Sequence, residues 1–280
     1  MEKIFKDIIQ KALKEDIGEG DITTESFVKK DIIFHGTIIS KSNGILCGTE
    51  FASECFKTLN PDAKIKAIKN DGQTIKPNDI IIEIVSDRTI LSAERTALNI
   101  IQRLSGIATK TKKFVDEINQ YSRTKIYDTR KTTPNLRAME KYAVKTGGGE
   151  NHRFGLFDAF MIKDNHIAAC NNFDEISNMI KIARKKYSDK KIEIEVKSID
   201  EVKKAILLDV DIIMLDNMSI DDMKIAIEMI RGKRKDIEIE ISGGINETNI
   251  KHVALLEPDR ISIGALTHSY TSLDISLEIN

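Results

Sequence analysis

Apolar residues recur along this chain at two different spacings, and the spacing changes near residue 100. Short β-type runs occupy 32–39, 64–68 and 79–85, with turn-forming residues between them. A helical spacing holds from 91 to 119, and residues 1–25 show a similar helical pattern. The first third of the chain is therefore predicted to combine helices with a small sheet.

Beyond residue 120, strand-like and helical patterns alternate. Helix starts are marked at Ser198, where Glu201 completes a capping box, at Ser219, and after Asn246. This alternation predicts parallel strands, and because no G-x-G-x-x-G motif follows a strand, a (β/α) barrel is favoured over a Rossmann sheet. Six strands are visible, so either the barrel is incomplete or it contains further strands that the pattern does not show. The six visible strands are 124–129, 159–163, 191–196, 210–215, 236–242 and 260–265.

Composition narrows the class of protein. The 280 residues are 41% hydrophobic, which excludes a disordered chain, and 43 basic against 44 acidic residues argue against a general nucleic-acid binder. No apolar run is long enough for a membrane helix, and the N-terminus does not resemble a signal peptide. The three cysteines lack zinc-site spacing, so reduced thiols in the cytoplasm are expected.

Polar or glycine residues follow nearly every predicted strand. In (β/α) barrels the active site lies at the carboxyl ends of the strands, so these residues are candidates for one common site. One such residue is ordinary loop chemistry, but six in register are hard to explain in that way. The segments are 129–134, 163–166, 195–197, 216–217, 242–244 and 264–268.

Basic side chains are concentrated between residues 123 and 163, a segment that contains nine Lys and Arg but only four Asp and Glu. A small polyanion is the natural partner, because the planar fork of Arg binds two carboxylate or phosphate oxygens at once. Arg130 and Lys131 come directly after a strand and are the leading candidates. Lys141 and Lys145 are instead expected on the outer face of a helix.

Two further groups of strand-end residues suggest phosphate and metal chemistry. Ser242-Gly243-Gly244 and Gly264 end two consecutive late strands, where barrels often bind phosphate. Glu195 and Asp216 end neighbouring strands, where they could bind Mg²⁺ or ribose hydroxyls, or simply pair with nearby lysines. Lys163 could form a Schiff base if its amine were neutral.

The same residues carry a resemblance to a known family. The sequence resembles nicotinate-nucleotide pyrophosphorylase (carboxylating), also called quinolinate phosphoribosyltransferase, over nearly its whole length. The longest matching segment is DTRKTTPNLRAMEKYAVKTGGGENHRFGLFDAFMIKDNHI, and the shorter ones are ALKEDIGEGDITT, ERTALNIIQRLSGIAT, EIEV, MLDN, SGGI and SIGALTHS.

The resemblance implies the type II phosphoribosyltransferase fold. An N-terminal α/β sandwich domain would span 1–104, with the tail 270–280 packing on it, and an open α/β barrel would span 105–269. The chain would act as a homodimer, with further assembly left open. The reaction implied joins quinolinate to phosphoribosyl pyrophosphate with Mg²⁺, giving nicotinate mononucleotide, CO₂ and pyrophosphate in NAD biosynthesis.

The resemblance also implies roles for individual residues. Arg130, His152, Arg153 and Lys163 would line the quinolinate site, and Arg95 would reach it from the partner subunit. Lys131 would lie between quinolinate and the pyrophosphate. Glu195 and Asp216 would face the ribose and the metal, directly or through water. Ser242, Gly243, Gly264 and His268 would surround the 5′-phosphate.

Three other functions stay open at this point. A relative with the same fold could use another acceptor, as in nicotinate phosphoribosyltransferase or the molybdenum-transport-associated relatives. A barrel aldolase could use Lys163 as a Schiff base. A non-catalytic anion-binding protein would leave the Glu195 and Asp216 pair without a purpose. The number of cations directed at carboxylates, and an assay with each acid, would separate these alternatives.

Overall fold

The computed structural model describes residues 1–170 and 173–279 of the chain. These residues form two compact units, which are described separately. The first unit contains Met1–Lys112, Thr132–Gly148 and Leu266–Asn280, and the second contains Lys113–Lys131 and Gly149–Ala265. The unit boundaries therefore differ from the expected 1–104 and 105–269, chiefly because 132–148 joins the first unit. Asn171, Asn172 and Asn280, which fall in the expected domain ranges, lie outside the described residues.

The first unit is built on a four-stranded antiparallel sheet in the order β12-β1-β5-β3. The tail residues expected to pack on this domain form β12, which pairs with β1. The strands are β1 (Phe34–Ser40), β3 (Lys64–Ala67), β5 (Ile80–Ser86) and β12 (Ile275–Ile279), with a separate short pair, β2 (Gly44–Ile45) and β4 (Thr74–Ile75). The helices are α1 (Lys3–Ile17), α2 (Ile22–Phe27), α3 (Thr49–Leu59), the greater part of α4 (Thr89–Asn119), α5 (Arg137–Thr146) and α11 (Ala265–His268).

The sequence patterns did not predict helix α3, and a long-range contact explains why. Gly48 precedes the helix with φ +101° and offers no side-chain cap. The carboxylate of Asp71 caps it instead, accepting hydrogen bonds from the backbone N–H groups of Gly48 at 2.8 Å and Thr49 at 2.9 Å. This cap comes from more than 20 residues away, so no local start signal marks the helix.

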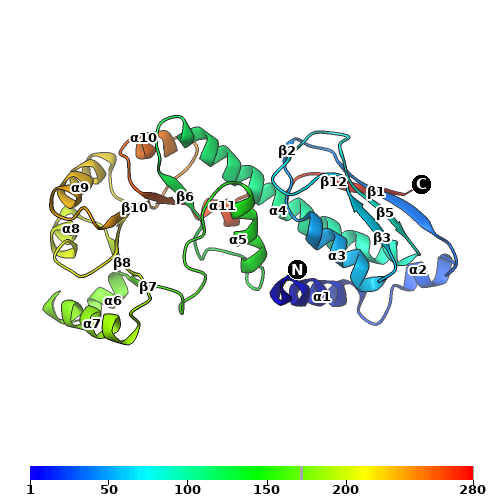
Figure 1. Ribbon diagram of the computed structural model, residues 1–280, viewed down its shortest axis with the longest axis horizontal. Coiled ribbons are helices and arrows are strands. Elements are labelled where there is room, and N and C mark those ends of the chain that lie inside the picture. The colour runs from blue at the N-terminus through cyan, green and yellow to red at the C-terminus, as the bar shows by residue number, and fades with distance from the viewer. Residues whose placement is uncertain (171–172, 280) are drawn as a thin grey trace. The chain divides into compact units, whose positions relative to one another are not determined.

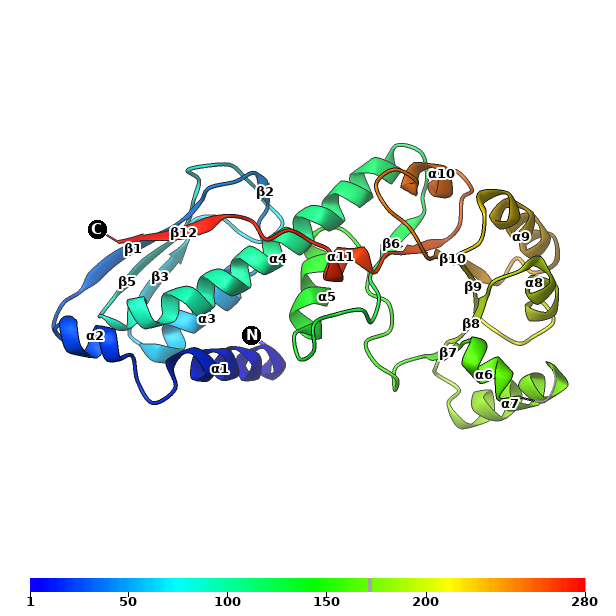
Figure 2. The ribbon, with the colours of Figure 1, turned by 180° about the vertical axis from the view of Figure 1, so that it is seen from behind.

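The second unit is an open barrel of six parallel strands; the alternating pattern predicted the parallel strands, and the family resemblance implied the open barrel. Their order is β6-β11-β10-β9-β8-β7, so β6 and β7 are the two edge strands (Figures 1 and 2). The strands are β6 (Lys125–Tyr127), β7 (Phe160–Ile162), β8 (Ile192–Val196), β9 (Ile212–Asp216), β10 (Glu238–Ser242) and β11 (Arg260–Ser262). The helices are α6 (Asp164–Ala168), α7 (Phe173–Lys186), α8 (Ile199–Ala205), α9 (Ile220–Lys233) and α10 (Ile250–Ala254).

Two of the predicted helix starts are confirmed by their caps. The Ser198 hydroxyl accepts a hydrogen bond from the Glu201 N–H at the start of α8, and Ser219 does the same for Asp222 at the start of α9. The Glu201 carboxylate closes back onto the N–H of Lys197, one residue earlier than a standard capping box. None of the described helices is long and apolar enough to span a membrane.

The two faces of the barrel sheet have opposite chemistry. Neighbouring residues in register share a face, and each strand alternates between faces. Helices α8, α9 and α10 cover the outer face (Figures 1 and 2), which is apolar, whereas the inner face is largely polar. The outer residues include Ile126, Ile194, Ile213, Leu215, Ile239, Ile241 and Ile261; the inner residues include Glu193, Glu195, Asp216, Glu238, Glu240, Ser242, Arg260 and Ser262.

Candidate active site

The strand register brings several predicted site residues to one face of the sheet at its carboxyl edge. Glu195 of β8 lies opposite Met214 of β9, and Asp216 follows two residues later on the same face. Asp216 in turn lies opposite Ser242 of β10. The predicted site residues of β8, β9 and β10 therefore project into the barrel at the edge where barrel enzymes place their chemistry.

Lys163 and Glu195 form the closest ion pair at this edge. Lys163 follows β7, and its Nζ lies 2.5 Å from Glu195 Oε2. Lys197 Nζ lies 4.0 Å from the other carboxylate oxygen. The lysine pairing that the sequence left open as an alternative for Glu195 is thus present, and Glu195 is 8% exposed.

The carboxylate of Asp216 makes fewer contacts than that of Glu195. Its Oδ2 accepts a hydrogen bond from Asn217 Nδ2 at 2.9 Å, and the residue is only half-buried. Asn217 has a positive φ of 54°, which turns the chain sharply after β9. The Asn217 N–H donates to the carbonyl of Ser242, which ties the ends of β9 and β10 together.

Gly243 is required at the end of β10 for two reasons. Its φ is +92°, and a Cβ there would lie 2.4 Å from the side chain of Asn217. We predict that Gly243→Ala lowers the free energy of unfolding by about 1–3 kcal/mol, measured by denaturant titration. Gly232→Ala is the matched control, since a Cβ at Gly232 in α9 meets nothing within 4 Å and alanine favours helix. Equal stability of the two variants would contradict this account.

The candidate quinolinate residues His152 and Arg153 reach the barrel on a short extended segment. Glu150 pairs with Tyr127 beside the end of edge strand β6. Asp128, fully buried just after β6, accepts a hydrogen bond from the backbone N–H of His152 at 2.8 Å. The segment therefore delivers His152 and Arg153 to the same end of β6 from which Arg130 and Lys131 depart.

The charges of Arg130 and Arg153 influence each other at this end. Burial lowers the pKa of Arg153, and the positive charge of Arg130 lowers it further. Arg153 Nη1 donates to the carbonyl of Ala159 at 3.0 Å. The Nε of Arg153 is buried without a hydrogen-bond partner among the described residues, so Arg153 has a donor left for an anionic ligand.

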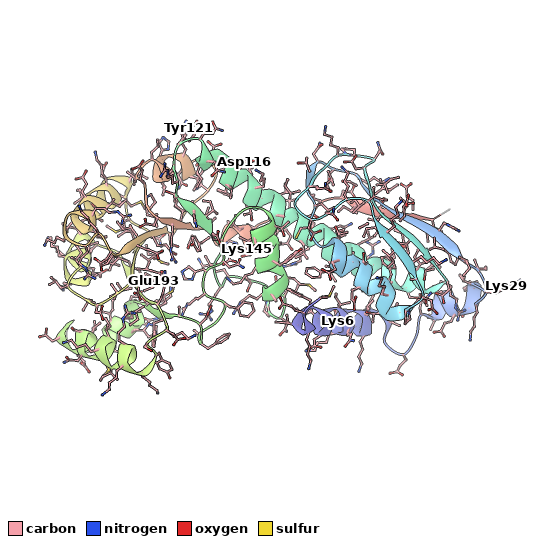
Figure 3. All side chains as sticks on the ribbon, viewed as in Figure 1. Lys6, Lys29, Asp116, Tyr121, Lys145 and Glu193 are labelled. Carbon is pink, nitrogen blue, oxygen red and sulfur yellow. The ribbon has the colours of Figure 1, made fainter. Side chains whose placement is uncertain are left out.

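The sequence patterns missed three charged residues inside the barrel. His152 Nε2 lies 3.1 Å from Glu193 Oε2 and 3.4 Å from Glu240 Oε1, and both glutamates are buried (Glu193 is labelled in Figure 3). Arg260 is the third. A signal was present: in IEIEV and EIEIS the acids alternate with isoleucine, although strands covered on both faces are usually apolar throughout.

The proton on His152 is held between the ring and these carboxylates. Burial opposes the charged ring, but the neighbouring carboxylates of Glu193 and Glu240 raise the pKa of His152 to about 9. The N–H of Arg153 points at Nδ1 from 2.7 Å, which favours a ring whose single proton is on Nε2. A ring charged at neutral pH would carry a proton on both nitrogens, but the Arg153 N–H needs a lone pair on Nδ1, so the geometry favours the neutral ring with its proton on Nε2, facing the carboxylates.

The remaining predicted site residues are divided between the two units. Arg95 on α4 and His268 on α11 belong to the first unit, whereas Ser242, Gly243 and Gly264 belong to the second. Arg95 is exposed, and its guanidinium approaches only Glu94, at 4.0 Å, among the described ion pairs. His268 is also exposed.

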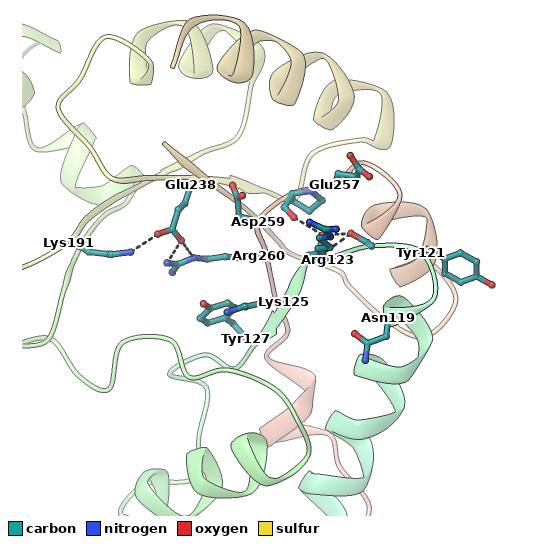
Figure 4. A pocket seen from close by; sticks show the side chains of 13 residues that line it. Asn119, Tyr121, Arg123, Lys125, Tyr127, Lys191, Glu238, Glu257, Asp259 and Arg260 are labelled. Atoms are coloured by element: carbon teal, nitrogen blue, oxygen red, sulfur yellow. Dashed lines mark hydrogen bonds and ion pairs between the residues drawn. The ribbon is translucent and has the colours of Figure 1, made fainter. Parts of the chain in front are cut away.

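The basic segment 123–163 divides in the structure. Arg123 and Lys125 lie at the opposite, amino-terminal edge of the sheet, beside a cavity of about 940 Å³ (Figure 4). None of the predicted site residues lines this cavity. The expectation that Lys141 lies on an outer helix face was wrong, because the residue is buried, whereas Lys145 is exposed.

Of the two carboxylates at the carboxyl edge of the sheet, Glu195 and Asp216, one is better suited than the other to bind a magnesium ion. Their oxygens are the donors that Mg²⁺ prefers. Glu195 already faces two lysines, so a direct bond to a metal would compete with them. Asp216 Oδ1 accepts no hydrogen bond from the described residues, which makes Asp216 the better placed ligand.

Comparison with known proteins decides the family. The model of the quinolinate phosphoribosyl transferase N-terminal domain matches residues 21–105, and that of the C-terminal domain matches residues 107–278. The chain belongs to the quinolinate phosphoribosyl transferase family. The resemblance carried by the sequence motifs and the expected fold are thereby confirmed.

Individual relatives agree over their full length. A probable nicotinate-nucleotide pyrophosphorylase (carboxylating) of Methanocaldococcus jannaschii is 41% identical over 279 residues, covering 97% of this chain and 96% of the relative. The solved nicotinate-nucleotide pyrophosphorylase of Francisella tularensis is 42% identical with a TM-score of 0.89, covering 99% of this chain and 96% of that one. The enzyme of that name from Ehrlichia chaffeensis is 39% identical with a TM-score of 0.92, and each chain is covered completely.

Proposed function

We propose that this chain transfers phosphoribosyl from phosphoribosyl pyrophosphate to quinolinate and releases CO₂, forming nicotinate mononucleotide and pyrophosphate in NAD biosynthesis. The observation that carries the proposal is the hydrogen bond of the His152 N–H to Asp128 just after β6, which brings Arg153 to the same end of the strand that Arg130 follows. Quinolinate is a dianion, and a pair of cationic forks suits its two carboxylates. Family membership supports the same reaction.

The residues of the site have distinct proposed roles. Arg130, Arg153 and Lys163 bind and orient quinolinate, with His152 beside them. The pyridine nitrogen attacks the anomeric carbon of the ribose as pyrophosphate departs. Lys131 stabilises the departing anion, while the carboxylates of Glu195 and Asp216 stabilise positive charge on the ribose. The quaternary nitrogen then stabilises the carbanion that remains when the adjacent carboxylate leaves as CO₂, and this carbon takes up a proton from water to give nicotinate mononucleotide.

The phosphate end of the donor is proposed to bind at the late strands. Gly243 and Gly244 both have positive φ, so their backbones can approach a ligand closely. Ser242 and Gly264 end the adjacent strands of the same unit. Helix α10 has only five residues, so the loop backbone rather than the helix supplies the expected N–H groups. His268 is proposed to complete the phosphate site.

Magnesium is proposed as the cofactor, held by Asp216 together with donor oxygens, with Glu195 acting directly or through water. The ion would neutralise charge on the pyrophosphate. We predict that Asp216→Asn, which keeps the shape but loses the charge, raises the Mg²⁺ concentration needed for half-maximal rate about tenfold or more. Asp221→Asn in α9 is the control. An unchanged Mg²⁺ requirement in Asp216→Asn would remove Asp216 from the metal site.

A homodimer, alone or within a larger assembly, is proposed to complete the quinolinate site with Arg95 of the partner subunit. The exposure of Arg95 supports this, since 61% of its side chain is open to solvent. We predict that mixing inactive Arg95→Ala and Lys131→Ala subunits restores about a quarter of wild-type activity. Half of the dimers are then mixed, and each has one intact site of two. No recovery, with subunit exchange confirmed by mass, would place Arg95 outside the partner's site.

The alternatives are less well supported. Lys163 is ion-paired with Glu195, which stabilises an ammonium group, whereas a Schiff base needs a neutral amine. A nicotinate enzyme needs fewer cations, because nicotinate has one carboxylate. Measuring pyrophosphate release with quinolinate and with nicotinate tests the proposal; a preference for nicotinate would overturn it. We also propose that the enzyme works in the cytoplasm, without a nucleic-acid or membrane partner.

A further inference from the structure

The interior of the barrel contains a charged cluster that the proposed reaction does not use. Glu193, Glu240 and Arg260 project inward from β8, β10 and β11. Glu240 is 0% exposed and Glu193 is 2% exposed. Buried charges are costly, and well-packed apolar residues would often give a fold of equal stability. The cluster therefore calls for a role beyond stability.

Its contacts form a chain that leads to His152. Arg260 forms an ion pair with Glu238, and Glu238 also forms one with Lys191 at 2.5 Å (Figure 4). The guanidinium of Arg260 lies over the Tyr127 ring, 4.8 Å from its centre. Arg260 Nη1 then lies 3.8 Å from Glu240 Oε2. Glu240 Oε1 accepts a hydrogen bond from Ser262 and faces His152 Nε2.

The other nitrogen of the same ring supports the backbone of the candidate substrate site. His152 Nδ1 accepts the N–H of Arg153, while the N–H of His152 itself is held by Asp128. The ring thus has two carboxylates within 3.4 Å of Nε2, while Nδ1 holds the peptide that carries Arg153. Displacing the ring would move the Arg153 guanidinium relative to Arg130.

We infer that Glu240, together with Glu193, is a positioning residue of the quinolinate site, which acts through the His152 ring to hold Arg153 in place. This inference rests on the proposed function. Neither glutamate touches the substrate in this account. The two carboxylates favour a proton on Nε2, which leaves the lone pair of Nδ1 to accept the Arg153 N–H.

His152, Glu193 and Glu240 could alternatively form a metal site. Ligand atoms of His152, Glu193 and Glu240 lie within 4.8 Å of one another. A divalent ion would have to displace the proton on Nε2, and it would lie near the positive charge of Arg260. Since Glu240 already has Ser262 and Arg260 as neighbours, a proton balances the cluster better than a metal.

A double-mutant cycle tests the inference. Glu240→Gln keeps the shape of the side chain but loses its charge, and we expect the KM for quinolinate to rise about tenfold, with the KM for phosphoribosyl pyrophosphate changed less than twofold. In a His152→Asn background, Glu240→Gln should change the quinolinate KM less than twofold, because its effect passes through His152. Glu193→Gln should behave as Glu240→Gln does.

Three results would overturn the inference. The first is a wild-type quinolinate KM in folded Glu240→Gln. The second is an equal effect of Glu240→Gln with and without His152. The third is stoichiometric Zn²⁺ or Mn²⁺ binding by the wild type that Glu240→Gln abolishes. Absence of quinolinate turnover in the wild type is a separate result, since it refutes the proposed function itself. If Glu240→Gln fails to fold, Ser262→Ala, which removes one Glu240 contact, should show a smaller rise in the same KM.

Discussion

Arg130→Ala is expected to lower kcat/KM for quinolinate by about 100-fold or more. Removing one partner of a close charge pair typically costs about 2–5 kcal/mol, and each 1.4 kcal/mol is a factor of ten. Because Arg130 also disfavours the charge of neighbouring Arg153, its removal should leave the free energy of unfolding unchanged or raise it. Steady-state kinetics and denaturant titration on the same sample measure both effects.

Two variants sharpen this prediction. Arg130→Lys keeps the charge but loses the planar fork, so it should recover only part of the activity. Arg123→Ala is the matched control, because Arg123 precedes the same strand, β6, at the opposite edge of the sheet. A loss of similar size in Arg123→Ala, or near wild-type kinetics for Arg130→Ala, would contradict the assignment of Arg130.

Arg103→Ala is expected to lower the free energy of unfolding by about 3 kcal/mol. Arg103 on α4 donates to the fully buried carboxylate of Glu140, through Nε at 3.0 Å and through Nη2, and it also donates to Thr133. Its guanidinium lies 4.9 Å from the centre of the Tyr270 ring. Removing the cation leaves a buried charge without compensation, which costs about 3–5 kcal/mol.

The measurement is thermal unfolding, where about 3 kcal/mol corresponds to a fall of roughly 6–12 °C in Tm for a protein of this size. Lys66→Ala is the control, because the Lys66 pair with Glu83 is exposed and such pairs contribute about 1 kcal/mol at most. Arg103→Ala/Glu140→Gln should recover stability relative to Arg103→Ala. If Arg103→Ala were no less stable than Lys66→Ala, the buried pair of Arg103 and Glu140 would contribute no more to the free energy of unfolding than an exposed pair does.

The barrel could be predicted from sequence because its signals are local. Each of the six strands is a short run ended by polar residues, and the starts of α8 and α9 are marked by Ser198 and Ser219 within one turn. Helix α3 could not be predicted in the same way, since its cap comes from Asp71. The placement of 132–148 in the first unit likewise depends on long-range contacts such as Arg103 with Glu140.

Site residues that directly follow a strand could be predicted from the sequence pattern, whereas site residues elsewhere could not. Lys163, Glu195 and Asp216 could be placed by counting from strand ends. The segment carrying His152 follows no strand, and only its pairing beside β6 brings it to the barrel. Glu193 and Glu240 look like exposed residues of half-buried strands until closure of the sheet turns their face inward.

The most direct test of the central claim is the release of labelled CO₂ from carboxyl-labelled quinolinate by the purified chain. The account predicts release that requires both phosphoribosyl pyrophosphate and Mg²⁺, in equal amounts with pyrophosphate, and that is lost in Arg130→Ala. Release without the phosphoribosyl donor, or no release while nicotinate supports pyrophosphate formation, would contradict it.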